Sequence, residues 1–170
     1  VNGAVFHTAI QNMQREVNTA GASGVVQNII NTADASITGV EVDGRIAFAE
    51  SWLATFNVGM IDASYDDVFF DLDADGVVGS SDLALDLPRV PQATWGVGLI
   101  KDIDMGDSGA LVGQVNYQYR DRIAYTDSNF GWIQSANMLD ANLTWETPID
   151  GLAASIYGKN LLDEVQAGND

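Results

Sequence analysis

The residues best suited to chemistry lie in an acidic run, Asp71–Asp82, with the sequence DLDADGVVGSSD. Carboxylates stand at positions 1, 3, 5 and 12 of the run, and a glycine at position 6 permits the sharp turn of calcium-binding loops. Four carboxylates this close repel one another unless a cation lies between them. In such loops the seventh residue binds through its backbone carbonyl. The pattern therefore predicts a Ca²⁺ site formed by Asp71, Asp73, Asp75, Val77 (backbone carbonyl) and Asp82.

The same run resembles the single calcium loops of dockerin-type repeats, which also read Asp-Gly-x-x-x-Ser-x-Asp-Leu. It departs from the calcium-loop pattern at two positions. Gly79 at position 9 can bind only through water, and Asp82 at position 12 is shorter than the usual bidentate glutamate. The alternative is a solvated acidic loop without an ion. Under either interpretation, the eight acids and the lack of any base in residues 62–86 favour a cationic partner.

A second candidate is the segment Met105–Val112, MGDSGALV, which resembles the nucleophile segment of chymotrypsin-like proteases. In that chemistry Ser108 would attack and the loop amides would form the oxyanion hole. A histidine must act as the base, and the single histidine, His7, lacks the Ala-His-Cys setting of that family. Gly, Asp and Ser are also the residues of tight turns. We therefore predict a turn here, no catalytic residue and no enzyme, with a serine hydrolase as a remote alternative.

The charge balance limits the classes of partner. The 170 residues suit one domain and carry a formal net charge of −17, from 24 acidic and 7 basic residues. Binding of nucleic acid needs clustered Lys and Arg against the phosphates, so we predict no nucleic-acid partner. The chain has no cysteine, which excludes disulfides and thiolate zinc sites.

The elements that must position these residues show a two-residue rhythm, which is clearest in residues 139–146. Successive side chains of a strand point to opposite faces, so this strand has one apolar and one polar face. A soluble sheet turns such an apolar face to a core, whereas a transmembrane barrel turns it to lipid. No apolar run is long enough for a transmembrane helix. The apolar face carries Leu139, Ala141, Leu143 and Trp145, and the polar face carries Asp140, Asn142, Thr144 and Glu146.

We predict seven strands, and the connections between them alternate in length. The connections after the second, fourth and sixth strands are tight, and those after the first, third and fifth are long and polar. Short periplasmic turns and long extracellular loops are typical of outer-membrane barrels, whereas a soluble sandwich has no reason to separate its loops in this way. The predicted strands are Gly3–Glu16, Asp34–Ala49, Ser51–Ser64, Ala93–Ile103, Gly109–Ile123, Met138–Glu146 and Leu152–Asn160, with a Gly/Ala/Asn-rich connection through Asn31.

Aromatic residues lie near both ends of these strands. Trp52 and Trp145 stand beside short turns, while Trp95, Tyr117 and Tyr119 stand near the long loops. Two such bands are typical of the girdles at the two membrane interfaces, and ordinary strand aromatics are the alternative. On the polar face we expect His7 as a filler of the lumen. Glu41, Asp43 and Arg45 share one strand face and are expected to line the lumen.

Four segments, in order along the chain, resemble the barrel of TonB-dependent outer-membrane receptors. They are Asn2–Thr8 (NGAVFHT, with Met13-Gln14 further on), Asn31–Glu41 (NTADASITGVE), Leu87–Pro91 (LPRVP) and Tyr157–Glu164 (YGKNLLDE). The resemblance implies an all-β, antiparallel transmembrane barrel of 22 strands with a plugged lumen. It also implies uptake of a scarce solute, such as siderophore-bound iron, cobalamin or an oligosaccharide, powered through TonB.

The resemblance fixes the expected organisation. We expect residues 1–170 to form part of one barrel domain, with an acidic extracellular insertion at 66–90 that contains the calcium-like loop. The chain begins at Val1 without the plug, the TonB-contacting segment or a terminal strand, so we expect a fragment of a larger receptor. Expected partners are outer-membrane lipid, TonB through the missing plug, and a small solute or metal chelate. The alternative is a calcium-stabilised extracellular β-sandwich that binds a partner or a glycan.

Overall fold

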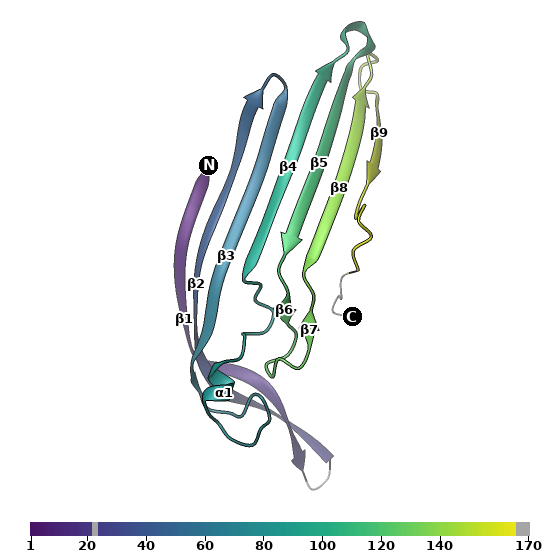
Figure 1. Cartoon of the computed structure of the whole chain (residues 1–170). Coiled ribbons are helices and arrows are strands. Elements are labelled where there is room, and N and C mark those ends of the chain that lie inside the picture. The colour runs from purple at the N-terminus through teal and green to yellow at the C-terminus, as the bar shows by residue number, and fades with distance from the viewer. Residues whose placement is uncertain (22–23, 166–170) are drawn as a thin grey trace.

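The computed structural model describes residues 1–21 and 24–165, and its main feature is one antiparallel sheet of seven strands (Figure 1). Each strand pairs with its neighbour in the order β1-β2-β3-β4-β5-β8-β9, and β6 and β7 form a separate small ladder. Within this described part, no helix is long and apolar enough to cross a membrane. The strands are β1 Asn2–Gly21, β2 Gly24–Ala49, β3 Trp52–Val68, β4 Ala93–Asp104, β5 Ala110–Arg120, β6 Ile123–Ala124, β7 Trp132–Ile133, β8 Ala136–Glu146 and β9 Ala153–Gly158.

The connections separate by length, as predicted. The short β2–β3, β4–β5 and β8–β9 turns lie together at the top of Figure 1. The long β3–β4 connection, which carries the one-turn helix α1 (Ser80–Leu83), and the β5–β8 connection, which carries β6 and β7, lie at the opposite end. The all-β prediction is therefore confirmed, and the predicted alternation of short turns and long loops holds from β2 to β9 but not for the β1–β2 connection.

The two faces of the sheet differ in chemistry. We call the face that carries Leu99, Val115 and Leu143 the outer face, and the opposite face the inner face. Large apolar side chains of the outer face remain exposed, which is unusual for a soluble protein and typical of a surface that meets an apolar partner. Exposed outer-face residues include Val5, Val40, Ile46, Val58, Met60, Trp95, Val97, Leu99, Ile103, Val115, Leu143, Trp145 and Ile156.

The inner face is polar and crowded in places. Asn57, Gln114, Asn116 and Asp140 lie on it. A Cβ atom at Gly98 would lie 2.5 Å from both Thr55 Oγ1 and Asn116 Oδ1, so this glycine permits the close approach of polar side chains. Among the described residues the second sheet is only the two-stranded β6–β7 ladder, so the chain does not form a sandwich of two large sheets, which corrects the β-sandwich alternative.

Two predictions about the N-terminal hairpin were wrong. The segment up to Asn31 was expected to be a connection, yet β1 and β2 remain paired as far as Gly21↔Gly24. These strands could not be predicted from the sequence, because backbone pairing holds them together while side chains such as Val25 stay exposed. His7 was expected on the polar face, but it pairs with Thr38 on the side of Val5. Phe6 takes the inner position instead and packs over Gly39.

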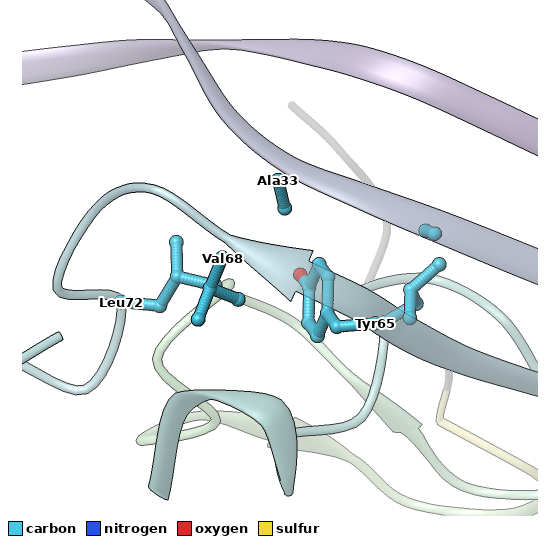
Figure 2. Packing of buried hydrophobic residues seen from close by; sticks show 6 residues of the cluster. Ala33, Tyr65, Val68 and Leu72 are labelled. Carbon is cyan, nitrogen blue, oxygen red and sulfur yellow. The ribbon is translucent and has the colours of Figure 1, made fainter. Parts of the chain in front are cut away.

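The buried cluster lies at the long-loop end of the sheet, between strands β2 and β3 and the β3–β4 connection (Figure 2). It begins on the inner face of β2 and β3, where Ala35 pairs with Tyr65, and the β3–β4 connection adds Leu72 and Leu87. Figure 2 shows Tyr65, Val68 and Leu72 gathered below the ribbon that carries Ala33. The β3–β4 connection therefore folds over the inner face rather than extending into solvent.

Candidate functional site

The acidic run Asp71–Asp82 is built around one buried carboxylate. Asp82 is fully buried, and its Oδ1 accepts hydrogen bonds from the amides of Leu72 (2.6 Å) and Asp73 (3.1 Å). Its Oδ2 accepts a hydrogen bond at 2.8 Å from the amide of Gly79, the N-cap residue of helix α1. A single side chain therefore joins the start of the loop to its end.

The protonation of Asp82 follows from these contacts. Burial raises the pKa of this carboxyl, but the amides of Gly79, Asp73 and Leu72 lower it by more, so the pKa lies below its usual value. The residue is thus ionised at neutral pH although it is buried. A buried anion is favourable only where donors or a cation compensate it.

Two further carboxylates face Asp82. The Oδ2 of Asp71 accepts from the amide of Gly76 at 2.8 Å, and the Oδ1 of Asp73 accepts from the amide of Asp75 at 3.0 Å. One oxygen each from Asp71, Asp73 and Asp82 lie within 4.8 Å of one another. Grouped carboxylate oxygens are the ligands that Ca²⁺ prefers, so these three residues could hold a divalent cation.

The structure unites three of the five predicted ligands. Asp75 lies outside the three-carboxylate group; its Oδ1 accepts from the amide of Val77 at 2.8 Å. The side chain of Val77 is exposed, as position 7 requires of a residue that would bind only through its backbone. The roles of Asp75 and Val77 as ligands stay predictions.

The long connections contact one another across the inner face. Asp127 of the β5–β8 connection lies 2.9 Å from the Arg15 guanidinium of β1 and accepts a hydrogen bond from the Tyr65 hydroxyl at 3.4 Å. Asn129 exchanges two hydrogen bonds with the backbone of Asp86, at 2.8 and 2.9 Å. We call these parts together, residues 13–15, 31–35, 61–92 and 121–135, the loop layer. Its contacts join strands that are not neighbours in the sheet.

Tyr65 is the centre of this layer. It lies in β3 five residues beyond the last β3–β4 pair, Met60↔Ala93, where β3 pairs only with β2. Burial first, and then the nearby Asp127 carboxylate, raise the pKa of the Tyr65 hydroxyl to about 12, although Arg15 opposes them. The phenol is therefore a neutral donor that fixes Asp127.

The space inside the loop layer is small. A cavity of about 40 Å³ lies between the β3–β4 and β5–β8 connections, lined by residues that include Leu87, Asp121 and Trp132. Such a cavity holds water rather than a solute. The guanidinium of Arg122 lies over the Trp132 ring at 4.4 Å beside it. Sequence reasoning missed these contacts, because it described the connection after the fifth strand only as long and polar.

The protease-like residues do not form a site. Ser108 ends a short 3₁₀ turn, Gly106–Ser108, and its backbone carbonyl accepts a hydrogen bond from Trp145 Nε1 at 2.8 Å. His7 lies on β1, which β2 and β3 separate from the β4–β5 turn, and its Nδ1 contacts Thr38 Oγ1 at 2.9 Å. The segment is a turn, as the sequence predicted.

A family model described as "TonB dependent receptor-like, beta-barrel" matches residues 1–161. The chain belongs to this family. TonB-dependent receptors are outer-membrane transporters and not enzymes, and an exposed apolar outer face is what a barrel wall in that membrane requires. The paired strands and the separated turns agree with that assignment.

The fold of this TonB-dependent receptor chain is similar to that of a solved structure. The crystal structure of the ferric yersiniabactin uptake receptor FyuA from Yersinia pestis matches with a TM-score of 0.71 and 24% sequence identity. The match covers 95% of this chain and 22% of that chain. No curated protein matches. The likeness supports the fold alone, and this chain spans about a fifth of the solved receptor.

Proposed function

We propose that this chain is part of the barrel of an outer-membrane receptor that takes up a scarce solute with energy from TonB. The observation that carries the proposal is the pairing of a bare apolar outer face with a polar inner face that the loop layer partly covers. An uptake receptor needs a wall stable in lipid, a polar passage and loops that capture the solute. Membership of the family supports the coupling to TonB.

The solute is proposed to be a siderophore–iron complex, cobalamin or an oligosaccharide. The neighbouring solved structure is a siderophore receptor, at low identity, which supports the first class most directly. Contacts with the solute would come from the long connections, with residues 66–86 as the leading segment. The remaining strands, the plug and the other loops of the complete receptor would supply the rest.

Uptake in whole cells tests this function. Cells that express the full-length receptor are compared with cells that lack it and with cells that lack TonB. The probes are radiolabelled iron supplied as siderophore, labelled cobalamin and labelled maltodextrin. We expect one probe to require both the receptor and TonB. If all three enter equally in the three strains, the proposed uptake function is wrong.

We also propose that the loop Asp71–Asp82 binds Ca²⁺ through Asp71, Asp73, Asp75, the carbonyl of Val77 and Asp82. Three of these carboxylates already converge, and no basic residue occurs between Asp62 and Asp86 to neutralise them. The amide hydrogen bonds satisfy some carboxylate lone pairs but add no net positive charge. A divalent cation would supply that charge and tie the loop to helix α1.

Calorimetric titration of the full-length receptor with Ca²⁺ tests this site. We expect heat from one site, lost in Asp71→Asn and kept in Asp62→Asn, which makes the same charge change outside the loop. Asp73→Asn serves as a second variant, because Asp82→Asn would also weaken the hydrogen bonds that fold the loop. Equal heat in the wild type, Asp71→Asn and Asp73→Asn would remove the calcium proposal and leave the uptake proposal intact.

A further inference from the structure

One row of the sheet interrupts the apolar outer face. The register places Trp52, Lys101, Gly113, Leu143 and Ile156 side by side across β3, β4, β5, β8 and β9. The row lies close to the short β2–β3 and β4–β5 turns, which are the periplasmic side in barrels of this kind. In this row the positively charged Lys101 lies beside Gly113, which has no side chain.

Gly113 opens a groove in this row. A Cβ atom there would meet only Leu143 Cδ1, at 3.7 Å, so nothing fills the space in front of the backbone. The groove has a volume of about 730 Å³, and its outer-face walls are Leu99, Val115, Leu143, Ile156 and Leu161. On the next row Ala141 pairs with Gly158, and the Leu161 side chain covers Gly158 and closes the groove there.

Lys101 supplies the charge at one end of the groove. Its ammonium donates to the carbonyl of Glu50 at 2.9 Å and lies 5.3 Å from the centre of the Trp52 ring. An ammonium has three donors, so further hydrogen bonds can form. Among the Lys and Arg residues of the described strands, Lys101 lies on the outer face, Arg45 and Arg120 lie on the inner face, and Arg15 pairs with Asp127 of the loop layer.

We propose that this groove binds a glycerophospholipid of the periplasmic leaflet. One acyl chain lies over Gly113 between Leu99, Leu143 and Ile156, and the phosphate pairs with the Lys101 ammonium. Charge complementarity selects this occupant, because the remainder of the chain carries a large excess of acids and repels anions elsewhere. The proposal is additional to solute uptake and does not depend on it.

The physics of a bilayer decides which contacts hold the lipid. Lipid tails are as apolar as leucine, so no hydrophobic driving force favours one chain in the groove over its neighbours. Specific binding must come from packing into the notch and from the charge pair. A basic residue near the membrane surface contributes about a fivefold preference for an anionic headgroup. Both Lys101 and Gly113 are therefore needed.

Native mass spectrometry of the full-length receptor tests the site. The delipidated protein is titrated with palmitoyl-oleoyl phosphatidylglycerol, and the bound fraction is read directly. We expect one lipid to bind more tightly than the rest. Lys101→Gln should weaken it about fivefold, since it removes one charge near the surface. Gly113→Leu should fill the groove and remove that lipid while the general, weak lipid binding persists.

Two matched variants separate this site from ordinary lipid contact. Lys159→Gln removes a lysine just beyond β9, and Ala154→Leu adds bulk on the outer face outside the groove. Both should bind as the wild type does. Retention of heat-modifiable migration in gels identifies variants that fold. Equal binding in all variants, or a loss confined to Lys101→Gln or to Gly113→Leu among folded proteins, overturns the proposal.

Discussion

The outer face of the sheet and the loop layer both carry apolar side chains, but these are exposed on the outer face and buried in the loop layer. On the outer face, Val97, Leu99 and Val115 remain exposed because lipid is their solvent. In the loop layer, Tyr65, Val68 and Leu87 are buried among themselves because that end of the molecule meets water. The hydrophobic effect acts on the second group and gives little to the first.

The comparison shows that backbone pairing stabilises the sheet, whereas a few side-chain contacts stabilise the loop layer. The sheet is held by backbone pairing along ladders such as β4–β5 and β5–β8, which the exchange of one outer apolar side chain for another hardly alters. The loop layer depends on a few side chains, including one ion pair and the amides around Asp82. Mutations should therefore disturb the layer without opening the sheet, and the reverse should also hold.

The largest expected effect is in the loop core. Leu87 is 4% exposed, so Leu87→Ala should reduce the local free energy of opening of the loop layer by about 2–5 kcal/mol. Leu83→Ala, at a residue that is 40% exposed, should change it by no more than about 0.5 kcal/mol. Hydrogen exchange of the full-length receptor in vesicles measures both. Equal protection in the two variants would mean that the layer is not packed as the structure has it.

A charged residue introduced on the outer face tests whether this face of the sheet meets lipid. Val115→Arg should destabilise the receptor in lipid by about 2–4 kcal/mol, because the guanidinium enters the apolar part of the bilayer. Asn116→Arg, one residue later and on the inner face, should cost far less. Unfolding by denaturant in vesicles gives both values. A larger cost at residue 116 than at residue 115 would reverse the assignment of the faces.

The sequence predicts the sheet better than the loop layer for a physical reason. The alternation at Leu139–Glu146 is local, and each strand repeats it, so strands and faces can be identified from one chain. The exceptions lie in the N-terminal hairpin: its strands extend through residues predicted as a connection, and the face of His7 depends on Phe6 packing over Gly39. Contacts such as Arg15–Asp127 join residues far apart in sequence and leave no periodic signal.

The candidate site divides in the same way. The spacing of Asp71, Asp73 and Asp82 is a local pattern, and the structure brings these three carboxylates together. The burial of Asp82 and its three amide donors depend on how helix α1 closes the loop, which the spacing does not encode. The sequence therefore predicts that these three carboxylates meet, but it also predicts Asp75, which lies outside the group, and it does not show which carboxylate carries the structure of the loop.

A smaller effect should follow from breaking the ion pair of the layer. Arg15 and Asp127 are each about one-third exposed, at 33% and 35%, so solvent screens their attraction. Asp127→Asn should therefore cost about 1 kcal/mol in loop-layer stability, within the range of partly exposed pairs. Asp150→Asn, in the β8–β9 turn at the other end, is the control. Loss of the same stability in both variants would assign the effect to net charge rather than to this contact.

The effect with the narrowest range of conditions is a pH dependence above pH 10 that belongs to Tyr65 alone. Its pKa of about 12 in the folded layer lies above the ordinary value of 10.0, because burial and Asp127 disfavour the phenolate. The raised pKa stabilises the layer fully below pH 10, and the contribution is lost as pH rises towards 12, since the open state ionises first. The difference between the tyrosinate titrations of wild type and Tyr65→Phe isolates this group from the other tyrosines. A midpoint near 12 is expected, and a midpoint near 10 would mean that water reaches the phenol and that the loop core is open.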